Sequence, residues 1–260
     1  MKKICDDLAA EQDSLDLVIS QIKESDWDLP TPAEGWTIRD QISHLAFYDN
    51  KAVLAIQYQD AFNKHVKEIF NDPKSFIGAD INKGRAMAVK DIINWWRKER
   101  TSLLRALIVL DPRTRIPWYG PSMSAKSHAT ARLMETWAHG QDVVDALRVD
   151  RKPSDRILHI AYLGYQTFNW SFINHGLETP EKQVRLELKS PSGETWTWGP
   201  ADAENMIRGS AYGFCLVVIQ RRNYLDTDLE ATGDVAVKWM SIAQCFAGPP
   251  TIGPKQGSRV

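Results

Sequence analysis

Hydrophobic residues recur every three or four positions through the first part of the chain, a spacing typical of amphipathic helices. The first such segment runs from about Leu8 to Ile22 and ends before Pro30. A second begins at Thr37, and Asp40 follows three residues later in the capping-box pattern. The spacing therefore predicts two helices separated by a proline-containing connection.

The same period continues over three further stretches, at about 86–110, 124–148 and 154–174. Between the first two of these, residues 117–121 read Pro-Trp-Tyr-Gly-Pro, a sequence that cannot be helical. The last stretch ends before Gly176, because glycine readily adopts the left-handed conformation that closes a helix. The first part of the chain is thus predicted to consist of helices joined by non-helical connections.

Beyond Gly176 the period changes from three or four residues to two. Apolar and charged residues alternate over 184–189, which predicts a half-buried strand. A turn at 190–193 and a returning strand at 194–198 follow. Two further segments are predicted to be strand–helix units, with Ser210 and Asp234 as the helix N-caps.

These patterns predict an α+β protein. Residues 1–176 are expected to form a helical bundle, and residues 181–248 a small α/β domain. The boundary is expected near 176–182, where helical periodicity gives way to alternation. Residues 249–260 are rich in proline and glycine, so a flexible tail is expected.

Composition narrows the functional classes. Lys and Arg total 32 against 33 Asp and Glu, so no net charge attracts nucleic acid or an anionic membrane. The three cysteines lack the spacing of a zinc site or a disulfide framework. No secretory signal or membrane-spanning stretch is visible, which predicts a cytoplasmic protein. Ten tryptophans suggest an aromatic-walled pocket.

Three residues suggest a metal site. Glu135 and His139 are four residues apart, so both side chains leave the predicted helix on one face. His44 lies among apolar positions of the helix that begins at Thr37. Imidazole and carboxylate are good zinc ligands, and three protein ligands leave a position open for chemistry. On spacing alone, a surface pair and a core histidine explain the same residues.

Two motifs resemble a known family. The run 36–45, WTIRDQISHL, resembles the first ligand motif of DinB-like four-helix bundles. The run 131–142, ARLMETWAHGQD, is similar to the Glu-x-x-x-His ligand helix of mycothiol-dependent maleylpyruvate isomerases, whereas many DinB relatives have His-x-x-x-His there. The segment 117–125 resembles one metal-binding subgroup of that isomerase branch.

The resemblance implies that the helices of residues 1–176 form a four-helix bundle with an extra helix. It implies an enzyme in which His44, Glu135 and His139 bind one divalent metal, most often zinc. It also implies a low-molecular-weight thiol, such as mycothiol, as cofactor, and an arginine from the C-terminal domain as a catalytic residue. Arg221 and Arg222 best match that arginine by position, and a helix-terminal pair of cations is the alternative reading. Isomerisation or S-transfer on a small carboxylate or acyl compound is the expected reaction.

Two other functions remain open from the sequence. A metal-bound water on the same bundle would support hydrolysis or hydration, and a protein without catalysis would bind a metal or small molecule. The expected partner is a small-molecule substrate, not nucleic acid or a membrane. A homodimer is one possible assembly.

Overall fold

The structure, a computed structural model, describes residues 1–259 apart from the side chain of Ser75. The chain divides into two compact units, Met1–Asp150 and Arg151–Val260. Within the described residues, no helix is both long enough and apolar enough to cross a membrane.

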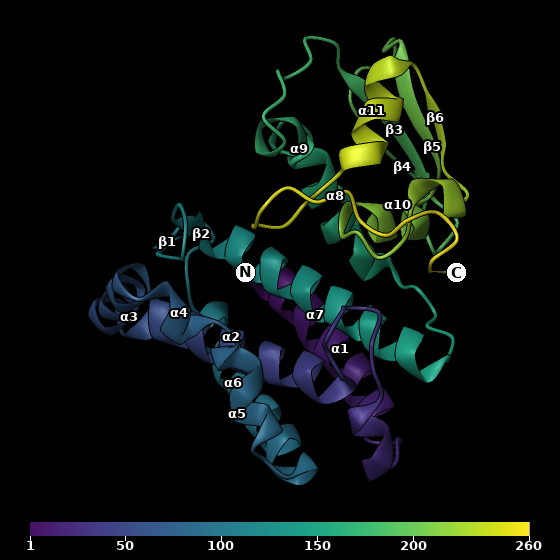
Figure 1. Cartoon of the computed structure of the whole chain (residues 1–260). Coiled ribbons are helices and arrows are strands. Elements are labelled where there is room, and N and C mark those ends of the chain that lie inside the picture. The colour runs from purple at the N-terminus through teal and green to yellow at the C-terminus, as the bar shows by residue number, and fades with distance from the viewer. Residues whose placement is uncertain (260) are drawn as a thin grey trace. The chain divides into compact units, whose positions relative to one another are not determined.

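The first unit is built on a bundle of long helices (Figure 1). Helix α2 packs along α6 and α7, and α1 packs against α7 and α6. Leucine, isoleucine and tryptophan side chains from these helices are fully buried between them, including Leu45, Trp96 and Leu133. The bundle helices among the described residues are α1 (Lys2–Ile19), α2 (Ile38–Gln57), α6 (Val89–Ile108) and α7 (Ala125–Leu147). The predicted four-helix bundle is therefore confirmed.

Side-chain caps fix where the ligand-bearing helices begin. The Thr37 backbone N–H donates to Oδ2 of Asp40 at 3.0 Å, so the predicted capping box starts α2. Ser124 starts α7, because its Oγ accepts from the backbone N–H of Ser127 at 3.1 Å. Arg148 closes α7 in the left-handed region, at φ 56°.

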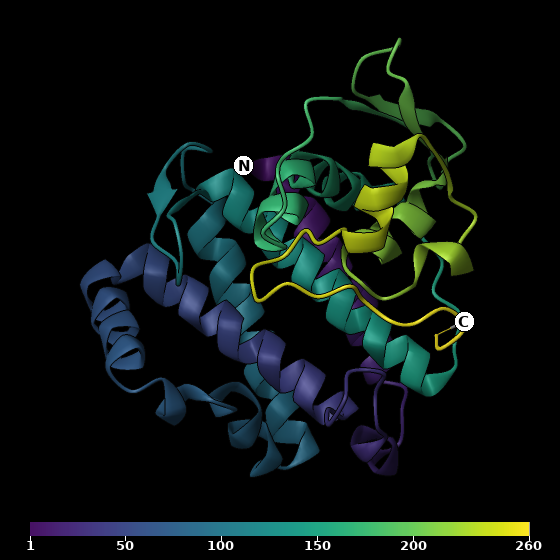
Figure 2. The same cartoon turned by 45° about the horizontal axis from the view of Figure 1, so that its top comes forward.

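Between α2 and α6 the chain forms short helices that the sequence analysis did not predict. These are α3 (Gln59–Asn71), α4 (Pro73–Phe76) and α5 (Ala79–Arg85). Figure 2 shows this excursion looping out from one end of α2. Before α2, a short 3-10 helix covers Glu24–Asp28. The segment 117–121 is a loop between the paired strands β1 (Arg115–Ile116) and β2 (Met123–Ser124), as its prolines predicted.

The second unit contains a twisted sheet of strand order β4-β3-β5-β6. Strands β3 and β5 are parallel and the other pairs are antiparallel. Helices α10 and α11 contact the sheet, and every second residue of β3 is buried. The strands are β3 (Val184–Lys189), β4 (Thr195–Trp198), β5 (Asn205–Ser210) and β6 (Glu230–Thr232), and the helices are α10 (Ala211–Val218) and α11 (Asp234–Ile242).

Both predicted strand–helix units are present, and one cap differs from the prediction. Ser210 caps α10, since its Oγ accepts from the N–H of Gly213. Gly233, not Asp234, precedes α11; Asp234 is the first helical residue, where its charge favours the positive helix end.

The division between the units differs from the expected boundary near 176–182. The predicted helix 154–174 is a 3-10 turn (Asp155–Ile157) followed by α8 (Leu158–Gln166) and α9 (Phe168–Asn174). Helix α8 packs on α10 and α9 packs on α11, so both belong to the second unit rather than to the bundle. Periodicity marks where helices end, whereas packing partners decide the unit to which they belong.

The segment 249–260, expected to be a flexible tail, is anchored through its described part. The Gln220 side chain donates to the carbonyls of Ala243 and Thr251, and Asn223 donates to the carbonyl of Pro254. The N–H of Gly257 donates to Asp226. Side chains outside the segment thus provide hydrogen-bond partners for its backbone groups.

Candidate metal centre

Three side chains of the types that bind metal ions converge between α2 and α7. His44 comes from α2, and Glu135 and His139 come from successive turns of α7. One ligand atom from each lies within 4.8 Å of the others. Nε2 of His139 lies 3.2 Å from Oε2 of Glu135, and Nε2 of His44 lies 3.8 Å from the same oxygen. Both imidazoles therefore direct the same nitrogen toward one carboxylate.

Gln41 fixes the orientation and the tautomer of His139. Nδ1 of His139 lies 2.5 Å from Oε1 of Gln41, and Nε2 of Gln41 donates to Oγ1 of Thr31 at 2.8 Å. The Thr31 hydroxyl in turn donates to the carbonyl of Trp36. The Trp36 carbonyl can only accept, so each hydrogen bond in this series is donated from the side of His139. Nδ1 of His139 must therefore be the donor to Gln41. In the neutral ring Nε2 then carries the lone pair that a metal ion needs, whereas in the protonated ring Nε2 donates to Glu135 instead.

Asp80 fixes the orientation and the tautomer of His44. Oδ2 of Asp80, on α5, lies 2.6 Å from Nδ1 of His44. An ionised carboxylate only accepts, so Nδ1 carries the hydrogen and Nε2 faces Glu135. A ligating histidine usually donates its second ring N–H in this way, and both histidines here have such a partner.

The charges of the site favour an ionised carboxylate. Burial opposes ionisation of Glu135, but hydrogen bonds from His139 and His44 outweigh it and hold its pKa well below the usual range. Burial also disfavours charge on His44, yet its bonds to Asp80 and Glu135 raise its pKa. Arg132, three residues before Glu135, is buried and pairs with the buried Asp49, with Nε and Oδ1 2.9 Å apart.

Aromatic side chains surround the two histidines. The Trp36 ring stacks on His139, with centroids 5.9 Å apart, and lies 5.2 Å from His44. The Tyr48 ring lies 4.6 Å from His44 and contacts Trp118 and Tyr119 of the loop at 117–121. Burial, then the negative charges of Asp80 and Glu135, raise the pKa of Tyr48 to about 12, so its phenol stays protonated.

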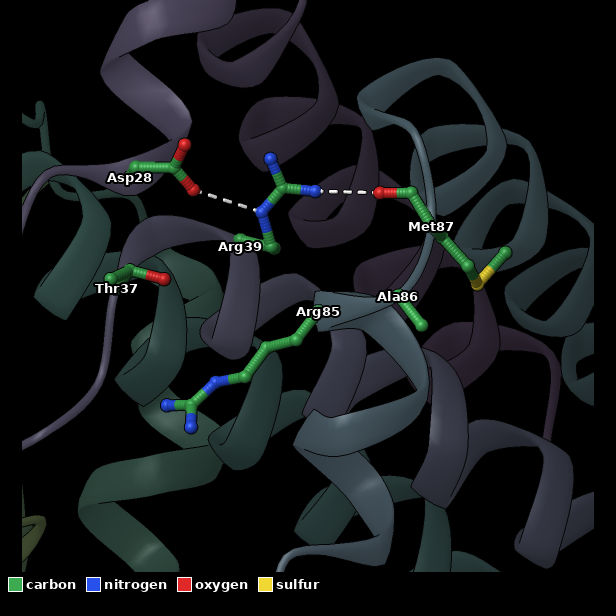
Figure 3. Close-up of a pocket in the computed structure, with 6 residues that line it drawn as sticks. All are labelled: Asp28, Thr37, Arg39, Arg85, Ala86 and Met87. Atoms are coloured by element: carbon green, nitrogen blue, oxygen red, sulfur yellow. Dashed lines mark hydrogen bonds and ion pairs between the residues drawn. The ribbon is translucent and has the colours of Figure 1, made fainter.

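A pocket of about 440 Å³ lies at the N-terminal end of α2, beside this cluster rather than at it. Figure 3 shows that Arg39 spans Asp28 and the carbonyl of Met87 there, with the Arg85 side chain on the opposite wall. None of the three converging ligands lines it. Both guanidinium groups already have carboxylate partners, Asp28 for Arg39 and Asp40 for Arg85.

Arg221 and Arg222, the arginines expected to be catalytic, lie after α10 in the second unit. Both backbone N–H groups donate to the carbonyl of Leu216. The Arg222 side chain lines a pocket of about 470 Å³ together with Asn223 and Lys255. Nη1 of Arg221 donates to the carbonyl of Ile219.

The structure thus brings together the three residues that the sequence proposed as ligands. Sequence reasoning missed Asp80, Gln41 and the Asp49–Arg132 pair. Gln41 lies three residues before His44 on the same helix, so helical spacing could have indicated it. Asp80 lies in a segment without a clear helical pattern, and nothing in the sequence indicated its contact with His44.

Comparison with known proteins agrees with this architecture. Two proteins of Mycobacterium tuberculosis, the uncharacterized protein Rv0036c of strain H37Rv and MT0041 of strain CDC 1551, are each 42% identical to the chain over 95% of its length and 96% of theirs. Crystal structures of mycothiol-dependent maleylpyruvate isomerase and of a mutant of it cover 88% of the chain and 92% of their own. Their TM-scores are 0.57 and 0.58, at 14% and 15% identity, so they share the fold.

Residues 8–144 match the model of the mycothiol maleylpyruvate isomerase N-terminal domain. This match covers the bundle helices and all three converging side chains. On that match the chain belongs to the mycothiol maleylpyruvate isomerase N-terminal domain family.

Proposed function

We propose that this protein is a divalent-metal-dependent enzyme that uses a metal-activated low-molecular-weight thiol for isomerisation or S-transfer on a small carboxylate or acyl compound. The convergence of His44, Glu135 and His139, with both outer imidazole nitrogens already engaged, carries the proposal. Membership of a family whose description names mycothiol and maleylpyruvate supports the thiol and the substrate class.

The donor set fits zinc. Two neutral imidazole nitrogens and one carboxylate oxygen are the usual protein ligands of a catalytic zinc ion, which keeps a further position open. Asp80 and Gln41 supply the outer partners that such histidines need. A zinc ion bound there lowers the pKa of a coordinated thiol and so supplies a thiolate near neutral pH.

The surrounding residues have separate tasks in this proposal. Trp36 and Tyr48 cover two sides of the histidine pair and limit access of water. The Tyr48 phenol, protonated at neutral pH, can donate a hydrogen bond to an anionic group of the substrate or thiol. The Arg132 charge beside Glu135 helps to keep that carboxylate ionised.

We assign binding of the substrate carboxylate to Arg221 or Arg222, because a guanidinium binds a carboxylate through two parallel hydrogen bonds. Replacing the productive arginine by alanine should lower turnover about ten- to hundredfold, since one charge-assisted contact is worth roughly 1.5–3 kcal/mol. Metal content should stay unchanged. Steady-state kinetics and elemental analysis of each single variant test the assignment, and unchanged turnover in both variants would refute it.

Metal content is the first test of the proposed function. Protein purified without added metal should contain about one equivalent of zinc by elemental analysis. The double variant His44→Ala, His139→Ala should lose it, because a single carboxylate remains. If that variant keeps its zinc, the metal is bound elsewhere and the assignment is wrong.

The thiol is tested on cobalt-substituted protein, whose visible spectrum changes when sulfur binds the metal. Mycothiol, bacillithiol and glutathione are titrated in turn, and turnover of small unsaturated carboxylates is measured with and without each. Thiol-dependent spectral change and turnover support the proposal. Turnover without any thiol would favour metal-activated water, and a metal that accepts no exogenous ligand would favour a protein without catalysis.

A further inference from the structure

The short helix α5 is docked on the face of α2 that carries His44. Four consecutive contacts form this seam, which we call the α2–α5 seam. Arg39 donates to the carbonyl of Met87 at 2.7 Å, and Arg85 donates twice to the buried carboxylate of Asp40, each time at 2.8 Å. Gly84 packs on Ser43, and Asp80 binds His44. The successive α2 residues are one, three and one positions apart, so they lie on one side of the helix.

Gly84 is the closest point of the seam. A Cβ at this position would lie 1.5 Å from Oγ of Ser43 and 2.7 Å from its Cβ. Such distances do not occur between real side chains, so any larger residue would push α5 away from α2. The close approach therefore requires glycine, even though glycine weakens a helix.

A helix as short as α5 gains little stability from its own hydrogen bonds. It spans Ala79–Arg85 and follows Gly78, which adopts φ 73°. Its position must come from contacts with its neighbour, and the seam supplies them. Asp40 has no exposed surface, so its pairing with Arg85 fixes the C-terminal end of α5. Asp80 fixes the N-terminal end.

We propose that α5 acts as a clamp on the metal centre: its docking through Gly84 and Arg85 holds Asp80 against Nδ1 of His44, which makes Asp80 a positioning residue. This inference rests on the proposed metal centre. The Asp80 carboxylate keeps the ring of His44 turned so that Nε2 points at Glu135. Removing an outer partner of this kind lowers metal affinity about ten- to hundredfold.

The first experiment measures zinc affinity of the full-length protein by competition with a chromophoric chelator. Asp80→Ala should weaken binding about ten- to hundredfold. Asp80→Asn keeps an oxygen acceptor for the His44 N–H and should lose less than Asp80→Ala. The matched control is Asp16→Asn: the Asp16 side chain is also 15% exposed and pairs with Arg97 and Arg100 of α6. Its zinc affinity should equal that of the wild type.

The second experiment displaces α5 without substituting Asp80. Gly84→Ala should reduce zinc affinity toward the level of Asp80→Ala, because α5 is displaced by Ser43. Adding Ser43→Gly removes both clashing atoms and should restore affinity. Gly120→Ala is the glycine control, because no described atom outside its chain neighbours lies within 4 Å of its added Cβ. Thermal melts by circular dichroism show that each variant is folded.

Four outcomes decide the matter. The pattern above, with rescue in the Gly84→Ala, Ser43→Gly pair, supports the clamp. Wild-type affinity in Asp80→Ala, with zinc still bound by the wild type, overturns the clamp alone. Equal and large losses in Asp80→Ala and Asp80→Asn would assign Asp80 as a direct ligand and also overturn it. A wild-type protein that binds no zinc overturns both the clamp and the proposed function.

Discussion

His128 lies seven residues before Glu135 on α7 and is almost completely buried, at 1% exposure. Its ring meets the Trp118 ring edge-on, with centroids 4.7 Å apart. Neither ring nitrogen has a hydrogen-bond partner among the described residues. Burial, with the nearby positive charge of Arg132, lowers the pKa of His128 to about 3. The residue is therefore neutral in the folded protein over the whole physiological range.

This neutrality predicts a loss of stability on acidification. In the unfolded chain a histidine binds a proton below about pH 6.5, whereas folded His128 does not until about pH 3. Because the unfolded state binds more protons, the free energy of unfolding falls as pH falls between these values. Between pH 7.5 and pH 5 the contribution is about 2 kcal/mol.

His128→Leu should remove this contribution, so the variant should lose less stability than the wild type over that interval. Urea unfolding at pH 7.5 and pH 5 measures the difference. The pH 7.5 comparison isolates the packing change, because histidine is mostly neutral in both states there. Parallel pH dependence in the two proteins would contradict the prediction.

At the residue scale the sequence was most informative where chemistry and spacing coincide. His44, Glu135 and His139 stood out because ligand-type side chains occupy positions that helical periodicity turns inward. Asp80 did not, since a single aspartate on a polar segment has no spacing that links it to a residue 36 positions earlier. Contacts between distant segments depend on packing, which a one-dimensional pattern does not encode.

At the scale of elements, α7 is the helix on which the candidate site depends. It supplies two of the three converging ligands and is buried along most of its length. Its ends are set by Ser124 and by Arg148. Helices α2, α6 and α7 were predicted within a few residues, whereas α1 begins at Lys2, six residues before the predicted start. Helices α4 and α5 were not predicted, because they are short and begin next to Pro73 and Gly78. Helix α3 was not predicted although it has 13 residues, because it buries only Phe62.

The cap of α7 gives an element-scale prediction. Ser124→Ala removes the acceptor for the Ser127 N–H and should lower the free energy of unfolding by about 1 kcal/mol. Ser124→Asp keeps an acceptor and should cost less. Urea unfolding at neutral pH measures both. Zinc content should not change, since Glu135 lies three turns further along; an equal loss of stability in both variants would argue against the cap.

On the scale of the whole molecule, the helices α8 and α9 decide where the chain can be divided. Gly164 of α8 lies so close to α10 that an added Cβ would be 2.9 Å from side-chain atoms of both Phe214 and Val218. Such contact buries apolar surface that would be exposed if α8 were separated from α10. The family match ends at residue 144, close to the Asp150 division.

Two truncated chains distinguish the possible boundaries. A chain of residues 1–150 contains all three proposed ligands together with Asp80 and Gln41, and should bind about one equivalent of zinc. A chain of residues 1–176 carries α8 and α9 without α10 and α11, and should aggregate more readily. Light scattering, circular dichroism and elemental analysis compare them. Zinc lost from a helical 1–150 chain would mean that the second unit contributes to the metal centre.

The α2–α5 seam also couples zinc binding at the proposed metal centre to the docking of α5. If docking of α5 improves zinc affinity through Asp80, thermodynamic reciprocity requires zinc to strengthen the docking of α5 by the same factor. Backbone amides of α5 should then exchange with deuterium more slowly in the zinc-loaded protein, and this protection should vanish in Asp80→Ala. When zinc is scarce in the cell, residues 79–85 would thus open locally more often. These residues include Arg85, which lines the pocket at the N-terminal end of α2.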